Sequence, residues 1–316
     1  MTASDRGARP SARLGLLQVC AAGVLWGTGG LVVTLLHERD GLGAMTVSAW
    51  RMVLAAVALI GFAMLTRRSR VALDTARAHP VLAVAVGVGT ALYQGLYFVS
   101  VLQVGVSIAT VVSLGLAPVL AATWEHLAAR TRPSRREVAV LTAALVGLVL
   151  ISLTAGHGTT STTAGSEPML GLVLSVAAGG TYAATTVLGH TLAQRVDPVA
   201  LTTCATVIGA LALTPFMAVA AATSQPVLSS DPTSLALLVY LGVATMALSY
   251  GLLYAGLRTT SGSAATVATL VEPLSAALLA ALILGERLTP PALLGGALIL
   301  AAVVALRPVE EHPAPA

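Results

Sequence analysis

The stretch SGSAATVATLVEPLSAALLAALIL at residues 261–284 decides the fold class of this chain. Its apolar and small residues do not alternate with polar ones as in a membrane β-strand, and Glu272 is its only charged residue. A helix of about 20 apolar residues crosses the hydrocarbon core of a bilayer. Because a backbone in lipid must satisfy its own hydrogen bonds, the stretch is predicted to be a transmembrane helix.

About ten such stretches fill the 316 residues. They are predicted at 14–36, 43–65, 79–101, 106–127, 137–154, 168–189, 199–222, 234–256, 261–284 and 289–307. Charged residues make up only 9% of the chain, whereas a soluble domain carries about 25%. The predicted fold class is therefore an all-α polytopic membrane protein with ten transmembrane helices, and soluble, disordered and disulfide-rich classes are excluded.

The arginines predict the orientation of the helices. All 17 basic residues are arginine. With the N-terminus inside, every arginine except Arg39, Arg51 and Arg287 falls on the inner side, a bias typical of cytoplasmic segments. The first apolar run lacks a small-residue cleavage site, so we expect an uncleaved helix. We expect a bacterial inner-membrane protein with cytoplasmic tails at 1–13 and 308–316. The bacterial origin is inferred from the absence of lysine and the abundance of alanine, which are typical of a GC-rich bacterial genome.

The two halves of the chain resemble each other at an offset of about 156 residues. Matching positions include Trp26/Tyr182, Ala49/Ala205, Tyr93/Tyr250, Gly95/Gly251, Tyr97/Tyr254, Ser107/Ser263 and Pro118/Pro273. We predict two five-helix repeats at 14–154 and 168–307, joined by a Gly/Thr/Ser-rich outer linker at 155–167. Five is odd, so the second repeat enters the membrane from the opposite side. Inverted repeats of this kind are common in secondary transporters.

The chain contains several distinctive short motifs: Leu25-Trp26-Gly27, Arg51, Glu272-Pro273 and Gly285-Glu286-Arg287-Leu288. These motifs resemble those of the EamA family of the drug/metabolite transporter superfamily. The resemblance extends over roughly 14–307. It implies ten helices in two inverted repeats around a central cavity, lined by helices one, three, four, six, eight and nine. It also implies transport of small metabolites, often amino acids and usually outward.

The chain departs from the family pattern at the end of the fourth predicted helix. In the first repeat, the position equivalent to the Gly-Glu-Arg motif holds Arg130-Thr131-Arg132-Pro133. The usual apolar end of the fourth helix is replaced by Trp124-Glu125-His126. Glu125 and His126 are compatible with a cytoplasmic gate or with a solvated salt bridge.

Glu272 and Arg51 are the ionisable residues that lie deep within predicted spans. Such residues are costly in lipid and are functional candidates. Glu272 could bind a substrate amine or carry a proton, or its carboxylate could accept hydrogen bonds from backbone amides freed near Pro273. Arg51 could pair within the protein or bind a substrate carboxylate, although the family resemblance places the second helix at the periphery. Pro118 and Pro273 are predicted to kink their helices at matched depths.

Aromatic and polar side chains recur on matching helix faces. Tyr93/Tyr97 and Tyr250/Tyr254 have i, i+4 spacing, so each pair shares one helix face. Rings with a polar tip suit a pocket for a small organic solute, although such rings also form interfacial belts. The predicted substrate-binding residues are Trp26, Tyr93, Gln94, Tyr97, Ser113, Tyr182, Tyr250, Tyr254, Thr269 and Glu272. Gly23 and Gly27 are expected to bring two helices close together.

The predicted function is export of small organic metabolites, most of all amino acids, by a secondary transporter that works by alternating access. The alternatives are a multidrug exporter and, from another class, a non-transport membrane assembly protein. The sequence contains no HExxH, GxSxG or phosphate-binding loop, so we expect no enzyme, cofactor or metal. The expected partners are a small-molecule substrate, the lipid bilayer and possible coupling protons, without nucleic acid, and the expected state is a monomer.

Overall fold

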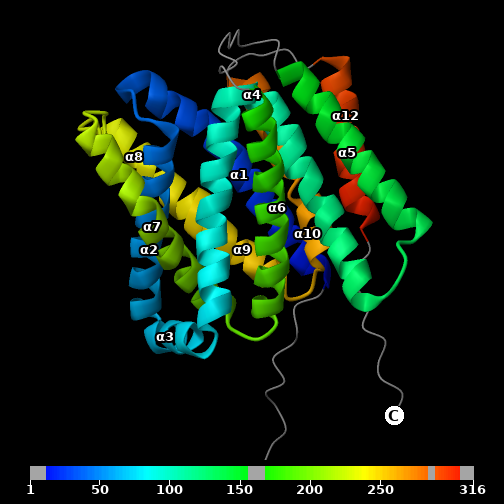
Figure 1. Ribbon diagram of the computed structural model, residues 1–316, viewed down its shortest axis with the longest axis horizontal. Helices are drawn as coiled ribbons and strands as arrows, with labels where there is room; N and C mark the ends of the chain where they lie inside the picture. Colours follow the sequence, from blue (N-terminus) through cyan, green and yellow to red (C-terminus); the bar gives the residue numbers. More distant parts are fainter. Residues whose placement is uncertain (1–11, 156–167, 284–288, 307–316) are drawn as a thin grey trace, which may run out of the picture.

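The computed structural model describes residues 12–155, 168–283 and 289–306, and every element in this part of the chain is a helix (Figure 1). The elements are α1 (Ala12–Asp40), α2 (Ala44–Leu65), α3 (Ser69–Ala78), α4 (Pro80–Ala129), α5 (Arg135–Ala155), α6 (Pro168–Ala193), α7 (Pro198–Ala222), α8 (Pro232–Gly242), the π-helix η1 (Val243–Leu248), α9 (Ser249–Gly256), α10 (Gly262–Ala268), α11 (Val271–Ile283) and α12 (Pro290–Ala305). Among these residues, 9 stretches are long and apolar enough to cross a membrane, and α12 is a shorter apolar helix.

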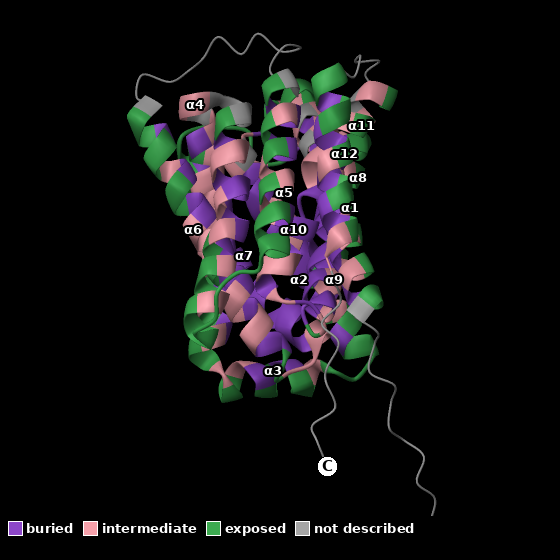
Figure 2. Ribbon diagram, turned by 90° about the vertical axis from the view of Figure 1, so that its right-hand side faces the viewer, coloured by how far each residue is buried: buried purple, intermediate pink, exposed green. Residues whose placement is uncertain are grey.

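The distribution of apolar side chains is that of a protein surrounded by lipid. Large apolar residues such as Leu65, Leu282 and Val304 are more than four-fifths exposed on the outside of the bundle. Buried residues form the centre (Figure 2). In water this outer surface would be an extended apolar patch, which monomeric soluble proteins rarely carry. The chain is therefore a multi-pass membrane protein.

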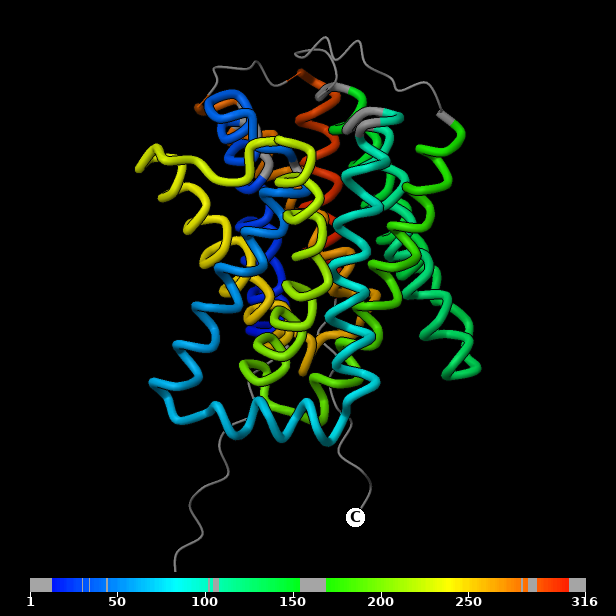
Figure 3. Tube along the Cα trace, turned by 60° about the vertical axis from the view of Figure 1, so that its left-hand side comes forward, coloured from blue at the N-terminus to red at the C-terminus, as the bar shows by residue number. Residues whose placement is uncertain are grey.

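The predicted helices 79–101 and 106–127 both belong to α4, whose two arms Pro80–Val101 and Ile108–Ala129 run in opposite directions (Figure 3). The Tyr97 hydroxyl lies 2.8 Å from the Thr110 hydroxyl. In a straight helix, 13 residues span about 20 Å, so this hydrogen bond requires the chain to turn back between them.

In the second half, two predicted spans are interrupted. The predicted helix 234–256 comprises α8, η1 and α9. The predicted helix 261–284 breaks at Thr269 and Leu270 into α10 and α11, which places Pro273 in the first turn of α11. A proline is tolerated there because the first-turn N–H groups have no partner within the helix. Pro118, by contrast, lies in the interior of the second arm of α4, so the matched prolines have different surroundings.

The segment between the second and third predicted spans forms an additional short helix, α3, where the sequence suggested only an arginine-bearing loop. Its Ala72 packs against Ala200 and Cys204 of α7. The Cys204 thiol donates a hydrogen bond to the Ala72 carbonyl oxygen at 3.0 Å. Cys204 therefore acts as a small buried residue that packs α7 against α3.

The arginine-bearing loops gather at one end of the bundle, which we call the arginine-rich end. The start of α1 lies there, with Gly15 against Gly256, and so does the end of α12, where Arg136 donates to the Ala305 carbonyl oxygen at 2.7 Å. Arg68 at the same end pairs with Asp197, whereas Arg39 pairs with Asp231 at the opposite end. Most of the predicted N-terminal tail and linker, the predicted C-terminal tail and the Gly285-Glu286-Arg287-Leu288 motif lie outside the described residues, whereas residues 12 and 13 already belong to α1.

Glycines set the closest helix contacts. A Cβ at Gly23 of α1 would lie 3.2 Å from the Thr269 carbonyl oxygen and 3.5 Å from the Glu272 nitrogen. A Cβ at Gly179 of α6 would lie 2.7 Å from the Ser113 carbonyl oxygen. We call α4 and α6 the α4 group, and α1, α9, α10 and α11 the α1 group; α10 also packs against α4. The expected role of Gly23 in close helix packing agrees with this geometry.

Asp197 caps α7 and gives a first prediction. Its carboxylate accepts hydrogen bonds from the Val199 and Ala200 N–H groups at 3.0 and 3.2 Å. Asp197→Ala should lower stability by about 1 kcal/mol, the usual cost of losing a cap. Thermal unfolding of the purified protein tests this, with Asp74→Ala on the exposed side of α3 as the matched control. Equal melting temperatures for the two variants would contradict the capping role.

Candidate functional site

The predicted aromatic residues form two rows of rings. In one row Trp26 and Tyr250 have ring centroids 5.1 Å apart, and Tyr250 and Tyr254 are 6.0 Å apart. In the other row Tyr182 stacks on Tyr93 at 4.9 Å, and Tyr93 lies 6.1 Å from Tyr97. Each ring in one row stands at the sequence position that matches a ring in the other.

The first row belongs to the α1 group and the second row to the α4 group. The two rows approach each other in the middle of the bundle. Tyr182 of α6 donates to the Thr269 hydroxyl at 3.0 Å, since that hydroxyl donates onward to the Thr266 carbonyl oxygen at 2.9 Å. Tyr250 lies within electrostatic range of both Tyr93 and Tyr182. The structure therefore brings together aromatic residues from four separate helices.

Exposure differs between matching rings. Tyr93 and Tyr97 are half-buried, whereas their counterparts Tyr250 and Tyr254 are buried, with Tyr254 only 3% exposed. Tyr97 lies near the end of the first arm of α4, away from the arginine-rich end, and Tyr254 lies close to that end. The tyrosines of the α4 row are thus more exposed than their counterparts on α9.

Glu272 and Arg51 both face this aromatic cluster. Arg51 lies within electrostatic range of Tyr250, Glu272 and Tyr93. Both charged residues are half-buried, and in the described part of the chain no ion pair joins them. The Glu272 carboxylate also accepts no hydrogen bond from any described residue, whereas its backbone N–H bonds to the Thr269 carbonyl oxygen at 2.9 Å. The geometry therefore disfavours the alternative in which the Glu272 carboxylate accepts hydrogen bonds from backbone amides freed near Pro273.

The polar residues predicted for the lining take different positions. The Ser113 hydroxyl donates to the Ala109 carbonyl oxygen of its own helix, and the Ser113 backbone contacts Gly179, so this residue belongs to a helix interface. Thr269 holds Tyr182 as described. Gln94 is buried, and neither end of its amide has a partner among the described residues. Gln94 thus retains its hydrogen-bonding capacity.

Arg51 was not among the predicted substrate-binding residues, although it lies near them in the structure. The family resemblance placed its helix at the periphery, but the side chain reaches inward and donates from Nη2 to the Thr245 carbonyl oxygen at 2.6 Å. The sequence did contain the signal, because a charged side chain deep in a span is a functional candidate by default.

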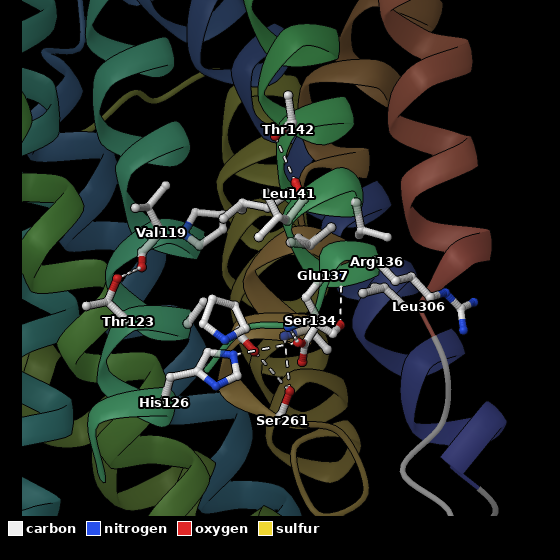
Figure 4. Close-up of a pocket in the computed structure, with 18 of the residues that line it drawn as sticks. Val119, Thr123, His126, Ser134, Arg136, Glu137, Leu141, Thr142, Ser261 and Leu306 are labelled. Atoms are coloured by element: carbon white, nitrogen blue, oxygen red, sulfur yellow. Dashed lines mark hydrogen bonds and ion pairs between the residues drawn. The ribbon is translucent and has the colours of Figure 1, made fainter. Parts of the chain in front are cut away.

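A separate pocket of about 770 Å³ lies at the arginine-rich end between the second arm of α4, α5 and α10 (Figure 4). Its lining includes His126, Glu137, Ser134 and Ser261, and Pro118 is the only predicted site residue on it. The His126 Nε2 atom lies 3.8 Å from a Glu137 carboxylate oxygen. Glu125 does not pair with His126 but contacts α10, as described below.

The fold and the polar, aromatic site inside it define a multi-pass membrane transporter. The chain belongs to the EamA-like transporter family, which matches residues 13–153 and 169–307. It is 28% identical over 286 residues to the "Uncharacterized transporter YwfM" of Bacillus subtilis (strain 168), covering 90% of each chain.

A second relative agrees with this assignment, and a solved structure shares the fold. The chain is 29% identical to the "Uncharacterized inner membrane transporter YicL" of Salmonella typhimurium (strain LT2), covering 93% of this chain and 95% of that one. A protein crystal structure superimposes with a TM-score of 0.74 at 18% identity, covering 92% and 95% of the two chains. The family prediction made from the sequence motifs is confirmed.

Proposed function

We propose that this protein is a secondary transporter that exports small organic metabolites, most of all amino acids, by alternating access and without altering them chemically. One observation carries the proposal: aromatic rings from both halves of the chain lie near a carboxylate, Glu272, and a cation, Arg51, that are not paired with each other. A hydrophobic amino acid offers an ammonium, a carboxylate and an apolar side chain to match them.

The proposed architecture is ten transmembrane helices in two inverted repeats. Its support is a set of contacts that recur at the sequence offset of about 156 residues. Gly23 packs on Thr269 and Glu272, and Gly179, its counterpart, packs on Ser113 and Leu116, the counterparts of those two residues. Gly15 against Thr259 and Thr260 corresponds in the same way to Gly171 against Gln103 and Val104.

Alternating access in this proposal is a rocking of the α4 group against the α1 group. Hydrogen bonds between the groups within the described residues include those from Tyr182 to Thr269, from Gln194 to the Leu257 carbonyl oxygen, and from Ser263 to Glu125. The last two lie at the arginine-rich end, which supports a state closed there and accessible from the other side. The arginine bias supports placing that end, with both termini, in the cytoplasm of a bacterial cell.

Counterflow in proteoliposomes tests the proposed substrate class. Vesicles containing the purified protein are preloaded with unlabelled amino acids, and uptake of labelled leucine or phenylalanine is measured. We expect exchange well above protein-free vesicles. Absence of exchange for every amino acid would refute this substrate class, and exchange of quaternary amines or dyes instead would identify a multidrug exporter.

Glu272→Gln tests coupling to protons under an imposed pH gradient. If Glu272 carries a proton, the variant should lose the acceleration that the gradient gives the wild type while retaining exchange at equal pH. The matched control is Glu137→Gln, since Glu137 caps α5 through Ser134 away from the aromatic cluster. The same pH response in wild type and Glu272→Gln would exclude Glu272 as the carrier.

A further inference from the structure

Arg51 is held in place by close contact between α2 and the irregular helix opposite it. A Cβ at Gly242 would lie 2.6 Å from the Leu54 Cβ and 3.2 Å from the Arg51 carbonyl oxygen. Only glycine allows the two backbones to approach this closely. The approach brings η1 within reach of the Arg51 side chain.

The π-helical turn then supplies the acceptor. In η1 the Ser249 N–H bonds to the Ala244 carbonyl oxygen rather than to that of Thr245, its α-helical acceptor. The Thr245 carbonyl oxygen accepts two side-chain hydrogen bonds instead, from Arg51 Nη2 at 2.6 Å and from the Ser249 hydroxyl at 2.7 Å. Such π-turns recur at functional sites. Here the turn fixes the direction of a guanidinium group.

The charge of this guanidinium has no neutralising contact among the described residues. A neutral carbonyl is its hydrogen-bond partner, and the Arg51 Nε–H is buried without a partner. The nearby carboxylate of Glu272 interacts with it electrostatically but forms no ion pair. An unpaired cation inside a membrane protein is costly even when half-buried, and guanidinium groups bind carboxylates with particular strength.

A second donor without a partner belongs to Trp26, whose ring packs on Tyr250. Trp26 is 8% exposed, its indole Nε1–H has no hydrogen-bond partner in the described part of the chain, and its ring contacts Tyr250. Tyr250 in turn lies within electrostatic range of Arg51. Two unsatisfied N–H donors therefore flank the same tyrosine, and buried donors of this kind are normally satisfied by a partner.

We propose that Arg51 and Trp26 form a subsite for the carboxylate of the transported molecule, with Glu272 available for its ammonium group. The inference rests on the proposed transport function and makes it more specific: the substrates carry a carboxylate. Arg51 then determines specificity, rather than serving only to join two helices.

Ligand binding to the purified protein in detergent, measured by calorimetry, tests the subsite. The probes are phenylalanine, phenethylamine, which lacks the carboxylate, and 3-phenylpropionate, which lacks the amine. The wild type should bind phenylalanine more tightly than phenethylamine by about 10- to 100-fold, the range for hydrogen bonds to a charged group. Arg51→Gln should abolish this preference and leave phenethylamine affinity unchanged.

Two further variants keep the test decisive. Arg51→Lys retains the charge and a donor for the Thr245 carbonyl, so it guards against misfolding, and it should weaken carboxylate binding about 10-fold because lysine lacks the planar fork. Arg39→Gln is the matched control, since Arg39 pairs with Asp231 on the surface, and it should bind all three probes as the wild type does.

The outcomes separate this inference from the proposed function. A wild type with no preference for carboxylate ligands, or an Arg51→Gln or Arg51→Lys variant whose preference is unchanged, would overturn the subsite. Carboxylate binding that depends on Arg51, together with no counterflow in vesicles, would support the subsite and refute transport. Counterflow of 3-phenylpropionate but not phenylalanine would support the subsite and refute the amino-acid class.

Discussion

Replacing Gly27 by leucine should prevent the helices from assembling. A Cβ at this position would overlap the Ser275 hydroxyl and lie 2.6 Å from the Glu272 carbonyl oxygen and 3.0 Å from the Ala276 nitrogen. The hydroxyl could rotate away, but the two backbone atoms cannot move unless α1 and α11 separate. Because Glu272 is part of this contact, the substitution should disturb the candidate site as well as the fold.

The size of the effect follows from the cost of overpacking. Even Gly27→Ala should destabilise the protein by about 3 kcal/mol, and a loss of that size lowers the melting temperature of a large domain by about 6–12 °C. Size-exclusion chromatography and thermal unfolding of purified protein measure both variants. Gly61→Ala is the matched control, since a Cβ there meets no atom within 4 Å. A Gly27→Leu protein that elutes and melts as the wild type does would contradict the observed packing.

Glu125→Gln should open the arginine-rich end. The Glu125 carboxylate accepts a hydrogen bond from the Ser263 N–H at 3.0 Å and another from the Ser263 hydroxyl, and so joins α4 to α10. Hydrogen bonds to a charged group contribute about 1.5–3 kcal/mol, so losing the charge should shift the equilibrium between closed and open states by about 10- to 100-fold. The sequence left the role of Glu125 open between a gate and a salt bridge, and this contact favours the gate.

Accessibility of position 254 reports this opening. Tyr254→Cys, in a background where Cys20 and Cys204 are replaced by alanine, places a single thiol at a buried position close to the arginine-rich end. The rate at which maleimide labels this thiol should rise at least about 10-fold when Glu125→Gln is added.

The control for this experiment is another glutamate at the same end. The Glu137 carboxylate accepts the Ser134 N–H at 2.6 Å within its own helix start and joins no described residue of the α1 group. Glu137→Gln should therefore leave the labelling rate of the Tyr254→Cys thiol unchanged. A rate that does not change with Glu125→Gln, or that rises equally with Glu137→Gln, would exclude a gate at Glu125.

The positions of the spans were predictable because hydropathy is a local property of the chain. The stretches at 43–65, 137–154 and 199–222 lie within a few residues of α2, α5 and α7. Aromatic pairing was predictable in part, because i, i+4 spacing places Tyr93 and Tyr97 on one face whatever surrounds the helix. The repeat suggested which other rings these helix faces would contact, but it did not determine those contacts.

Irregular helix geometry was not predictable from hydropathy. A π-turn at Val243–Leu248 and a break at Thr269 and Leu270 leave the apolar pattern unchanged, because every residue there remains small or apolar. The break lies where Pro273, which has no N–H, cannot bond to the Thr269 carbonyl oxygen, so the proline marks it in the sequence. The π-turn has no such mark and follows Gly242, which packs closely on α2.

The sequence by itself determined that this chain crosses the membrane repeatedly and belongs to its family, since composition, apolar length and short motifs are written in consecutive residues. Only the tertiary structure decided which charged and aromatic side chains meet. Arg51 is the case in point: one intramembrane arginine has the same sequence signature whether it faces lipid, a neighbouring helix or the centre. Its inward direction depends on the Thr245 carbonyl, 194 residues away, to which it donates a hydrogen bond.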